Sequence, residues 1–345
     1  MSSREVVAPE ASSTQRGVGE NVLEVDDVRV VYRVRGEDAP AVDGVSLSLA
    51  RGDTLALAGE SGCGKTTLAL ACMGLLPNNA RVEGSIRFRG EELIGAKPGR
   101  LRAVRWAGMS MIFQGAMNAL NPVKRIGDQM IEAIRLHEKV SNTEAADRSR
   151  SMLERVGIPP TRWRDYPHEF SGGMRQRAMI AMALVCNPDV VIADEPTTAL
   201  DVMVQAQILS LLDELRDEFG LALLLITHDL SVLVQVCDRA AIMYAGRVVE
   251  EGYASDLLTT PQHPYTRALV EAFPRVGDRN ARKIPPGLPG DPPHPAELPP
   301  GCKFHPRCPA RFEPCDEVDP ALLATGEERR AACHAVHRDL GLTAS

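Results

Sequence analysis

One octapeptide constrains the fold of this chain more than any other feature. Residues 59–66 read Gly-Glu-Ser-Gly-Cys-Gly-Lys-Thr, which fits the pattern G-x-x-x-x-G-K-[ST] of a phosphate-binding loop. The loop follows a predicted buried strand, Thr54–Ala58, and precedes a helical pattern over residues 66–76. Its glycines let successive backbone N–H groups turn inward at a helix N-terminus, where an anion is stabilised. A chance glycine turn is the alternative, and the strand–loop–helix context argues against it.

Two side chains of this loop have predicted roles. Lys65 adds a point charge for the β- and γ-phosphates, and the hydroxyl of Thr66 is a ligand for Mg²⁺. The predicted nucleotide-binding residues of the loop are Gly59, Ser61, Gly62, Cys63, Gly64, Lys65, Thr66 and Thr67.

A second apolar strand ends in two carboxylates. Residues 190–195 read Val-Val-Ile-Ala-Asp-Glu. Asp194, at the strand tip, is placed to hold Mg²⁺ directly or through its water, and Glu195 to polarise an attacking water. Acids at the end of a buried strand are common and weak as a signal by themselves. The phosphate-binding loop upstream favours the catalytic interpretation.

Ser171, Gly172 and Gly173 precede a helical pattern over residues 174–186. They predict a second anion-binding helix N-terminus in one chain. A nucleoside triphosphatase with one phosphate-binding loop does not need two such sites for one nucleotide. The economical interpretation is that this one serves the nucleotide of a partner subunit; the alternative is an ordinary N-cap by Ser171.

The order of the segments predicts an α/β fold. Strands alternate with helices over residues 190–244, which implies a central, mainly parallel sheet covered on both faces. Residues 1–21 are expected to be a disordered tail, and residues 22–275 a catalytic domain with an inserted helical subdomain at about 118–182. Residues 276–345 are expected to be a connector and a cysteine-containing appendage, since eight of the seventeen residues from 284 to 300 are proline.

Charge and hydropathy exclude several classes of protein. The chain carries 39 Lys and Arg against 46 Asp and Glu, a formal net charge of −7. No basic excess is present to neutralise phosphates, so nucleic acid is not expected as the main partner. Neither a signal peptide nor an apolar stretch of about 18 residues is visible, so we expect the chain in the cytoplasm, with membrane contact through another polypeptide.

These motifs together resemble the ABC (ATP-binding cassette) ATPase family, whose signature has Ser-Gly-Gly in this position. The resemblance covers about residues 22–275 and implies hydrolysis of ATP to ADP and phosphate by two cassettes that complete each other's sites. It implies that Gln114 senses Mg²⁺ and the permease, that His228 contacts the γ-phosphate beside the catalytic Glu195, and that Tyr32 stacks on adenine. It also implies that residues 198–201, which end in Asp201, communicate across the dimer.

The subfamily can be narrowed. Residues 170–177 (Phe-Ser-Gly-Gly-Met-Arg-Gln-Arg), 118–122, 193–201 and 263–266 are similar to one of the two ATPase subunits of dipeptide and oligopeptide importers. Met174 replaces the commoner glutamine, which affects only a side-chain contact. The resemblance implies a heterodimer with a second homologous ATPase subunit, two transmembrane permeases and an extracytoplasmic binding protein. The chain would then be peripheral, on the cytoplasmic face of the membrane.

Four cysteines gather in the last 44 residues: Cys302, Cys308, Cys315 and Cys333. In a reducing compartment such a cluster is more often a metal site than a set of disulfides. A tight C-x₂-C pair, usual for Zn²⁺, is missing, so the spacing favours a [4Fe–4S] cluster, and the resemblance points the same way. A zinc site and four unligated thiols are the alternatives.

Other functions remain as alternatives. Uptake of dipeptides or oligopeptides is the expected role, and the same ATPase role with oligosaccharide or nickel as cargo is the alternative within the subfamily. A soluble ABC ATPase acting on nucleic acid is disfavoured by the single phosphate-binding loop and the lack of heptads and of a basic patch. A P-loop kinase is disfavoured by residues 171–173 and by His228.

Overall fold

The computed structural model describes residues 20–115, 119–198, 200–272, 288 and 290–342. Residues 1–19 of the predicted N-terminal tail and residues 273–287 and 289, which include the start of the proline-rich stretch, therefore lie outside the described residues, as do Asn118 and Ala199. Among the residues that are described, no helix is long and apolar enough to cross a membrane.

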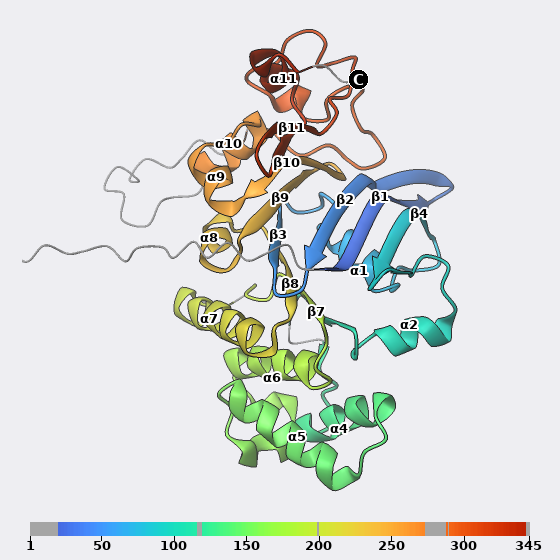
Figure 1. The fold of residues 1–345 in the computed structure, drawn as a ribbon, viewed down its shortest axis with the longest axis vertical. Helices are drawn as coiled ribbons and strands as arrows, with labels where there is room; N and C mark the ends of the chain where they lie inside the picture. The colour runs from blue at the N-terminus through green and yellow to red at the C-terminus, as the bar shows by residue number, and fades with distance from the viewer. Residues whose placement is uncertain (1–19, 116–118, 199, 273–287, 289, 343–345) are drawn as a thin grey trace, which may run out of the picture.

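An eight-stranded sheet with the order β11-β12-β10-β9-β3-β8-β7-β6 forms the centre of the molecule (Figure 1). Its first five strands in the chain run parallel to one another: β3 (Thr54–Ala58), β6 (Met109–Ile112), β7 (Val190–Asp194), β8 (Ala222–Thr227) and β9 (Arg239–Tyr244). Strands β3, β7 and β8 are buried along their whole length, as apolar parallel strands covered on both faces should be. The predicted α/β fold with a mainly parallel sheet is confirmed.

A second sheet, with the order β2-β1-β4-β5, packs over one face of the central sheet. Its strands are antiparallel: β1 (Asn21–Val34), β2 (Glu37–Ala50), β4 (Ala80–Phe88) and β5 (Glu91–Glu92). Helix α1 (Lys65–Cys72) contributes Leu68 and Cys72 to the apolar core that joins the two sheets. The start of α1, where the phosphate-binding loop ends, is thus fixed from both sheets.

Helices cover the other face of the central sheet. They are α6 (Gly172–Leu184), α7 (Val202–Phe219), η3 (Leu230–Val232) and α8 (Leu233–Val236). Beyond α6 lie α4 (Ile126–His137), α5 (Asn142–Arg155) and the short turns η1 (Pro160–Arg164) and η2 (Pro167–Glu169), at the end of the molecule opposite to the C-terminus (Figure 1). Helix α2 (Pro98–Val104) precedes β6.

The C-terminal segment is built into the central sheet, which the sequence did not predict. After β10 (Arg247–Tyr253), α9 (Ala254–Thr259) and α10 (Pro264–Ala272), the chain forms η4 (His305–Arg307), the hairpin β11 (Leu323–Gly326) and β12 (Arg329–Ala331), and α11 (His334–Leu340). β12 pairs antiparallel with β10, with Ala331 opposite Glu250. The segment therefore adds two strands to the central sheet, where the sequence predicted only an appendage.

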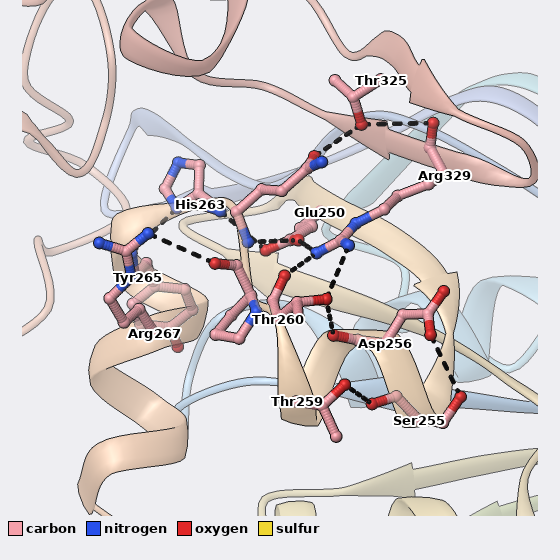
Figure 2. A network of polar contacts seen from close by, with 12 residues as sticks. Glu250, Ser255, Asp256, Thr259, Thr260, His263, Tyr265, Arg267, Thr325 and Arg329 are labelled. Carbon is pink, nitrogen blue, oxygen red and sulfur yellow. Dashed lines mark hydrogen bonds and ion pairs between the residues drawn. The ribbon is translucent and has the colours of Figure 1, made fainter. Parts of the chain in front are cut away.

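A buried carboxylate fixes this extension to the turn before α10 (Figure 2). Glu250 is 0% exposed and accepts hydrogen bonds from the backbone N–H groups of Gln262 and His263, each at 2.9 Å. It also pairs with Arg329 Nη2 of β12 at 2.8 Å. Because a buried charge is tolerated only when it is paired and hydrogen-bonded, these contacts hold strand, turn and hairpin together.

Candidate nucleotide-binding site

The predicted phosphate-binding loop connects β3 to α1, and its backbone admits only glycine at two positions. Gly64, the N-cap of α1, has φ +106°, and a Cβ there would lie 2.2 Å from the carbonyl oxygen of Ala41 in β2. A Cβ on Gly59, with φ +152°, would lie 2.2 Å from the carbonyl oxygen of Met243 in β9. The loop is therefore pressed between two strands, and side chains at these positions are excluded.

Lys65 is buried inside the curl of this loop, with 5% exposure. Its Nζ donates to the carbonyl oxygens of Gly59 at 2.8 Å and Glu60 at 2.9 Å and lies 3.5 Å from Cys63 Sγ. These acceptors are neutral, so they orient the ammonium group without cancelling its charge. The loop thus presents a positive charge and a helix N-terminus at one place, as phosphate binding requires.

Thr66 and Asp194 meet at the carboxyl ends of the strands. The Thr66 hydroxyl donates to Asp194 Oδ1 at 3.2 Å. Burial raises the pKa of Asp194, and the Thr66 hydrogen bond offsets part of that shift. A buried carboxylate beside a hydroxyl is a set of hard oxygen ligands whose negative charge a divalent cation would stabilise. The two residues therefore fit the predicted Mg²⁺ site.

Glu195 is the meeting point of three separate segments. Its carboxylate accepts hydrogen bonds from Gln114 Nε2 at 2.7 Å and from the Thr198 hydroxyl at 2.9 Å, and it lies 3.1 Å from His228 Nδ1. Burial alone would raise the pKa of Glu195, but the bonds from Thr198 and His228 hold it below its usual range. The group is therefore ionised at neutral pH and able to accept a proton.

A cavity of about 180 Å³ adjoins this carboxylate. It is lined by Glu195, Thr197, Thr198, Leu200, Gln205, Thr227, His228 and Asp229. The predicted site residues Glu195, Gln114 and His228 are thus brought together, beside a space that water or a small anion can enter.

Tyr32 lies at the other side of the loop. Its hydroxyl is 3.5 Å from the Thr67 hydroxyl, which joins β1 to the first turn of α1. The phenol ring is half-buried. The structure therefore brings Tyr32 next to the phosphate-binding loop, where the sequence analysis expected an aromatic residue.

The Ser-Gly-Gly stretch, residues 171–173, forms the start of α6. Ser171 is the N-cap, and its hydroxyl accepts from the Met174 N–H at 3.3 Å. A Cβ on Gly172 would meet open space, whereas one on Gly173 would lie 3.0 Å from Val204 of α7. Asp201 caps α7 by accepting from the Val204 N–H at 3.0 Å. These contacts join the start of α6 to the start of α7. None of them involves the phosphate-binding loop.

Two functional contacts escaped the sequence analysis. Arg307 of the C-terminal segment forms a double ion pair with the Glu60 carboxylate in the phosphate-binding loop. The Tyr265 hydroxyl accepts from the Glu60 N–H at 2.9 Å. No local signal predicts a pairing between residues 247 positions apart, although residues 263–266 were noted as a subfamily motif.

The four C-terminal cysteines lie in one folded segment. Cys315 and Cys333 are buried, Cys302 and Cys308 are half-buried, and the Cys302 N–H donates to the Cys315 carbonyl at 2.9 Å. Burial raises the pKa of Cys302 to about 11, and the thiols of Cys333, Cys315 and Cys308 are near enough to add to the shift. Nowhere in the described part of the chain, however, are three or more His, Cys, Asp or Glu side chains arranged to hold a metal ion.

Comparison with known proteins connects this site to a family. Residues 42–198 match the family described as ABC transporter, and residues 249–315 match the one described as the C-terminal region of oligopeptide/dipeptide transporters. The oligopeptide transport ATP-binding protein OppD of Salmonella typhimurium is 47% identical over 325 residues, which cover 93% of this chain and 96% of the relative. The chain belongs to the family of ABC transporter ATP-binding proteins.

Further matches agree with this membership in the ABC ATPase family. The dipeptide transport ATP-binding protein DppD of Bacillus subtilis is 47% identical over 318 residues, covering 91% of this chain and 94% of the relative. A dimeric ATP-binding cassette, solved in a post-hydrolysis state with ADP and Pi, is 25% identical with a TM-score of 0.61 and covers 67% of this chain and 98% of its own. The predicted family is confirmed, and so is the predicted activity: the ABC ATPase hydrolyses ATP in support of transport.

Proposed function

We propose that this ABC ATPase powers the uptake of dipeptides and oligopeptides through partner permeases. The match of residues 249–315 to the C-terminal region of oligopeptide/dipeptide transporters carries the choice of cargo. Oligosaccharide or nickel is the alternative cargo. The assembly would contain a second homologous ATPase subunit, two transmembrane permeases and an extracytoplasmic binding protein, with this subunit peripheral on the cytoplasmic face of the membrane.

The proposed chemistry uses residues that the fold gathers at the strand ends. Residues 59–67 bind the phosphate chain of ATP, with Lys65 at the β- and γ-phosphates, and Tyr32 stacks on adenine. Thr66, Gln114 and Asp194 hold Mg²⁺, which neutralises phosphate charge when bound. Glu195 accepts a proton from the water that attacks the γ-phosphorus, and the bond to ADP breaks as inorganic phosphate forms. His228 and Gln114 orient the Glu195 carboxylate.

The Ser-Gly-Gly stretch is proposed to act in trans. Ser171, Gly172 and Gly173 lie at the exposed start of α6, and their contacts run to α6 and α7. Their backbone N–H groups would face the γ-phosphate of the nucleotide bound to the partner, and residues 198–201 would report its state across the dimer. In this proposal residues 22–275 are the ATPase domain, with its helical subdomain at about 118–182.

We also propose a [4Fe–4S] cluster ligated by the thiolates of Cys302, Cys308, Cys315 and Cys333. The donor set fits in kind, because four thiols of one small segment lie near enough for their charges to interact. A single Zn²⁺ needs a tight tetrahedron with Zn–S distances of about 2.3 Å. The four described thiols form neither that tetrahedron nor another group arranged to hold a metal ion. The choice of the cluster therefore rests on their wide sequence spacing without a C-x₂-C pair, and a Cys₄ zinc site is the alternative. The cluster would stabilise residues 276–345 and take no part in ATP hydrolysis.

Two substitutions separate ATP binding from hydrolysis. Lys65→Ala removes the charge at the phosphates and should weaken ATP binding. Glu195→Gln keeps the shape of the side chain but cannot accept the proton, so ATP should bind and remain, while turnover falls by about 10²-fold or more. Nucleotide retention and phosphate release measure the two effects.

Glu214→Gln is the matched control, since Glu214 lies exposed on α7 with its carboxylate on Ser210. Turnover at the normal rate in Glu195→Gln would remove this residue from the mechanism. Uptake of labelled dipeptide into vesicles holding the complete transporter tests the cargo, and uptake of nickel or oligosaccharide instead would favour the alternative.

A further inference from the structure

A double ion pair joins the C-terminal segment to the phosphate-binding loop. Arg307 Nη1 lies 2.7 Å from Glu60 Oε2, and Arg307 Nη2 lies 3.0 Å from Glu60 Oε1. The Arg307 side chain is 6% exposed and that of Glu60 24%. A planar guanidinium with two parallel hydrogen bonds fixes the direction of a carboxylate as well as its distance. Glu60 is therefore held in one orientation by a residue from outside the nucleotide motifs.

The backbone of Glu60 is held as firmly as its side chain. Its N–H donates to the Tyr265 hydroxyl at 2.9 Å, and its carbonyl oxygen accepts from Lys65 Nζ at 2.9 Å. A displacement of Glu60 would therefore move an acceptor that orients the Lys65 ammonium group. The contact with Arg307 reaches the phosphate-binding lysine through a single residue.

An aromatic cluster supports the same contact. The ring centroid of Tyr244 lies 4.7 Å from that of Tyr265 and 5.3 Å from that of Phe304, and the Arg307 guanidinium lies 5.8 Å from the Tyr244 ring. Tyr244 ends β9, Tyr265 belongs to α10, and Phe304 precedes η4. Three separate segments thus pack under Glu60, so Arg307 has little freedom to leave it.

The segment that carries Arg307 has a second anchor near its other end. Arg329 pairs with the buried Glu250, whose carboxylate also receives the His263 N–H (Figure 2). His263 is two residues before Tyr265 and hydrogen-bonds to the backbone of Ala332. The anchors on Glu60 and Glu250 are thus connected through the turn at residues 263–265, and the folded segment is rigidly placed against the loop.

We propose that Arg307 is a positioning residue for ATP binding, which fixes Glu60 and thereby the loop that presents Lys65 to the phosphates. It follows that ATP affinity is coupled to the folded state of the C-terminal segment, in both directions, because binding linkage is reciprocal. The inference rests on the proposed assignment of residues 59–67 as the ATP site.

The test compares ATP affinity with turnover in the full chain. Arg307→Ala should weaken ATP binding and raise KM about tenfold, as expected for loss of a charged hydrogen-bonded pair, with kcat within about twofold. Arg307→Lys should recover part of the affinity, because a point charge cannot form the double contact. Arg311→Ala is the control: Arg311 belongs to the same segment and pairs with Asp316, but its side chain is 53% exposed.

A double-mutant cycle separates positioning from general stability. If Arg307 acts through Glu60, the loss of affinity in Glu60→Gln with Arg307→Ala should not exceed that of the worse single variant. Additive losses, or an ATP affinity in folded Arg307→Ala equal to that of Arg311→Ala, would overturn the inference. If Arg307→Ala does not fold, Arg307→Lys and Glu60→Gln form the same cycle.

Lys65→Ala distinguishes a failure of the proposed ATP site from a failure of the positioning role of Arg307. Normal ATP affinity in Lys65→Ala would contradict the assignment of the loop itself. Loss of affinity in Lys65→Ala with normal affinity in every Arg307 and Glu60 variant would contradict the positioning role alone.

Discussion

Glu195 has a backbone conformation that few side chains adopt, with φ +46°. A residue in this region stores about 1–3 kcal/mol of strain and persists only where its surroundings over-determine it. Three neighbouring side chains hold the Glu195 carboxylate in place: Gln114, Thr198 and His228. Glu195 lines the cavity that His228 also lines, so the strained conformation belongs to the proposed catalytic arrangement.

Gly172 offers a test of the action in trans at the scale of one side chain. Because a Cβ here meets open space, Gly172→Asp should leave the fold of its own chain intact. The added carboxylate would face the partner's γ-phosphate and repel it. We expect hydrolysis by the assembled dimer to fall about 10²-fold or more, while the isolated subunit binds ATP normally. Nucleotide affinity and phosphate release measure the two.

Gly172→Ala is the control for this prediction, since it adds bulk without charge and should retain most activity. If the isolated Gly172→Asp subunit no longer bound ATP, its Ser-Gly-Gly stretch would act on its own nucleotide.

The sequence predicts the positions of some site residues in the fold and not those of others. Lys65 and Glu195 are predictable because each has a local signal: Lys65 belongs to the glycine-rich motif after the buried strand β3, and Glu195 directly follows the buried strand β7. Arg307 is not, because its partner is 247 residues away and the pairing depends on how the C-terminal segment folds back.

Among the elements, the turn between α9 and α10 carries a pH-dependent contribution to stability. His263 is 1% exposed, and burial lowers its pKa to about 3, well below the value of about 6.5 in an unfolded chain. The folded state therefore keeps this histidine neutral while the unfolded state binds a proton. Stability from this group is present above about pH 6.5 and is lost as the pH falls from there toward 3.

Urea unfolding at pH 7.5 and pH 5 tests this prediction. The free energy of unfolding should fall more between the two pH values in the unmodified chain than in His263→Gln, which lacks the titrating ring. His294→Gln, at an exposed position, should fall like the unmodified chain. Equal pH dependence in all three would mean that folding does not lower the pKa of His263.

Strands were easier to predict than their partners. The buried strands β3, β7 and β8 are apolar except for one polar residue at an end of each, so composition alone indicates parallel strands inside a sheet. The four residues of β11 and the three of β12 show no such pattern. Their pairing depends on the buried Glu250–Arg329 contact, which no local rule of the sequence reveals.

At the scale of the whole molecule, the proposed [4Fe–4S] cluster has a direct readout. Protein purified without oxygen should be brown and contain about four iron and four sulfide ions per chain. Cys308→Ser should bleach it, while ATP still binds to the loop at residues 59–67. Cys237→Ala is the control, because Cys237 is buried in the apolar core on the helical side of the sheet. If the anaerobic protein contained zinc and no iron, the four cysteines would form a Cys₄ zinc site and the proposed cluster would be wrong.

The C-terminal hairpin at one edge of the central sheet affects whether the protein associates with itself. Strand β10 carries Val248 and Val249, both nearly buried, and lies between β9 and β12. Without residues 320–342, β10 would become an edge strand with an open row of N–H and C=O groups, a template for pairing with another chain. In the intact molecule the edge passes to β11, a four-residue strand with no buried residue. Short, partly polar edges resist such pairing, so the last residues of the chain also protect it from self-association into larger sheets.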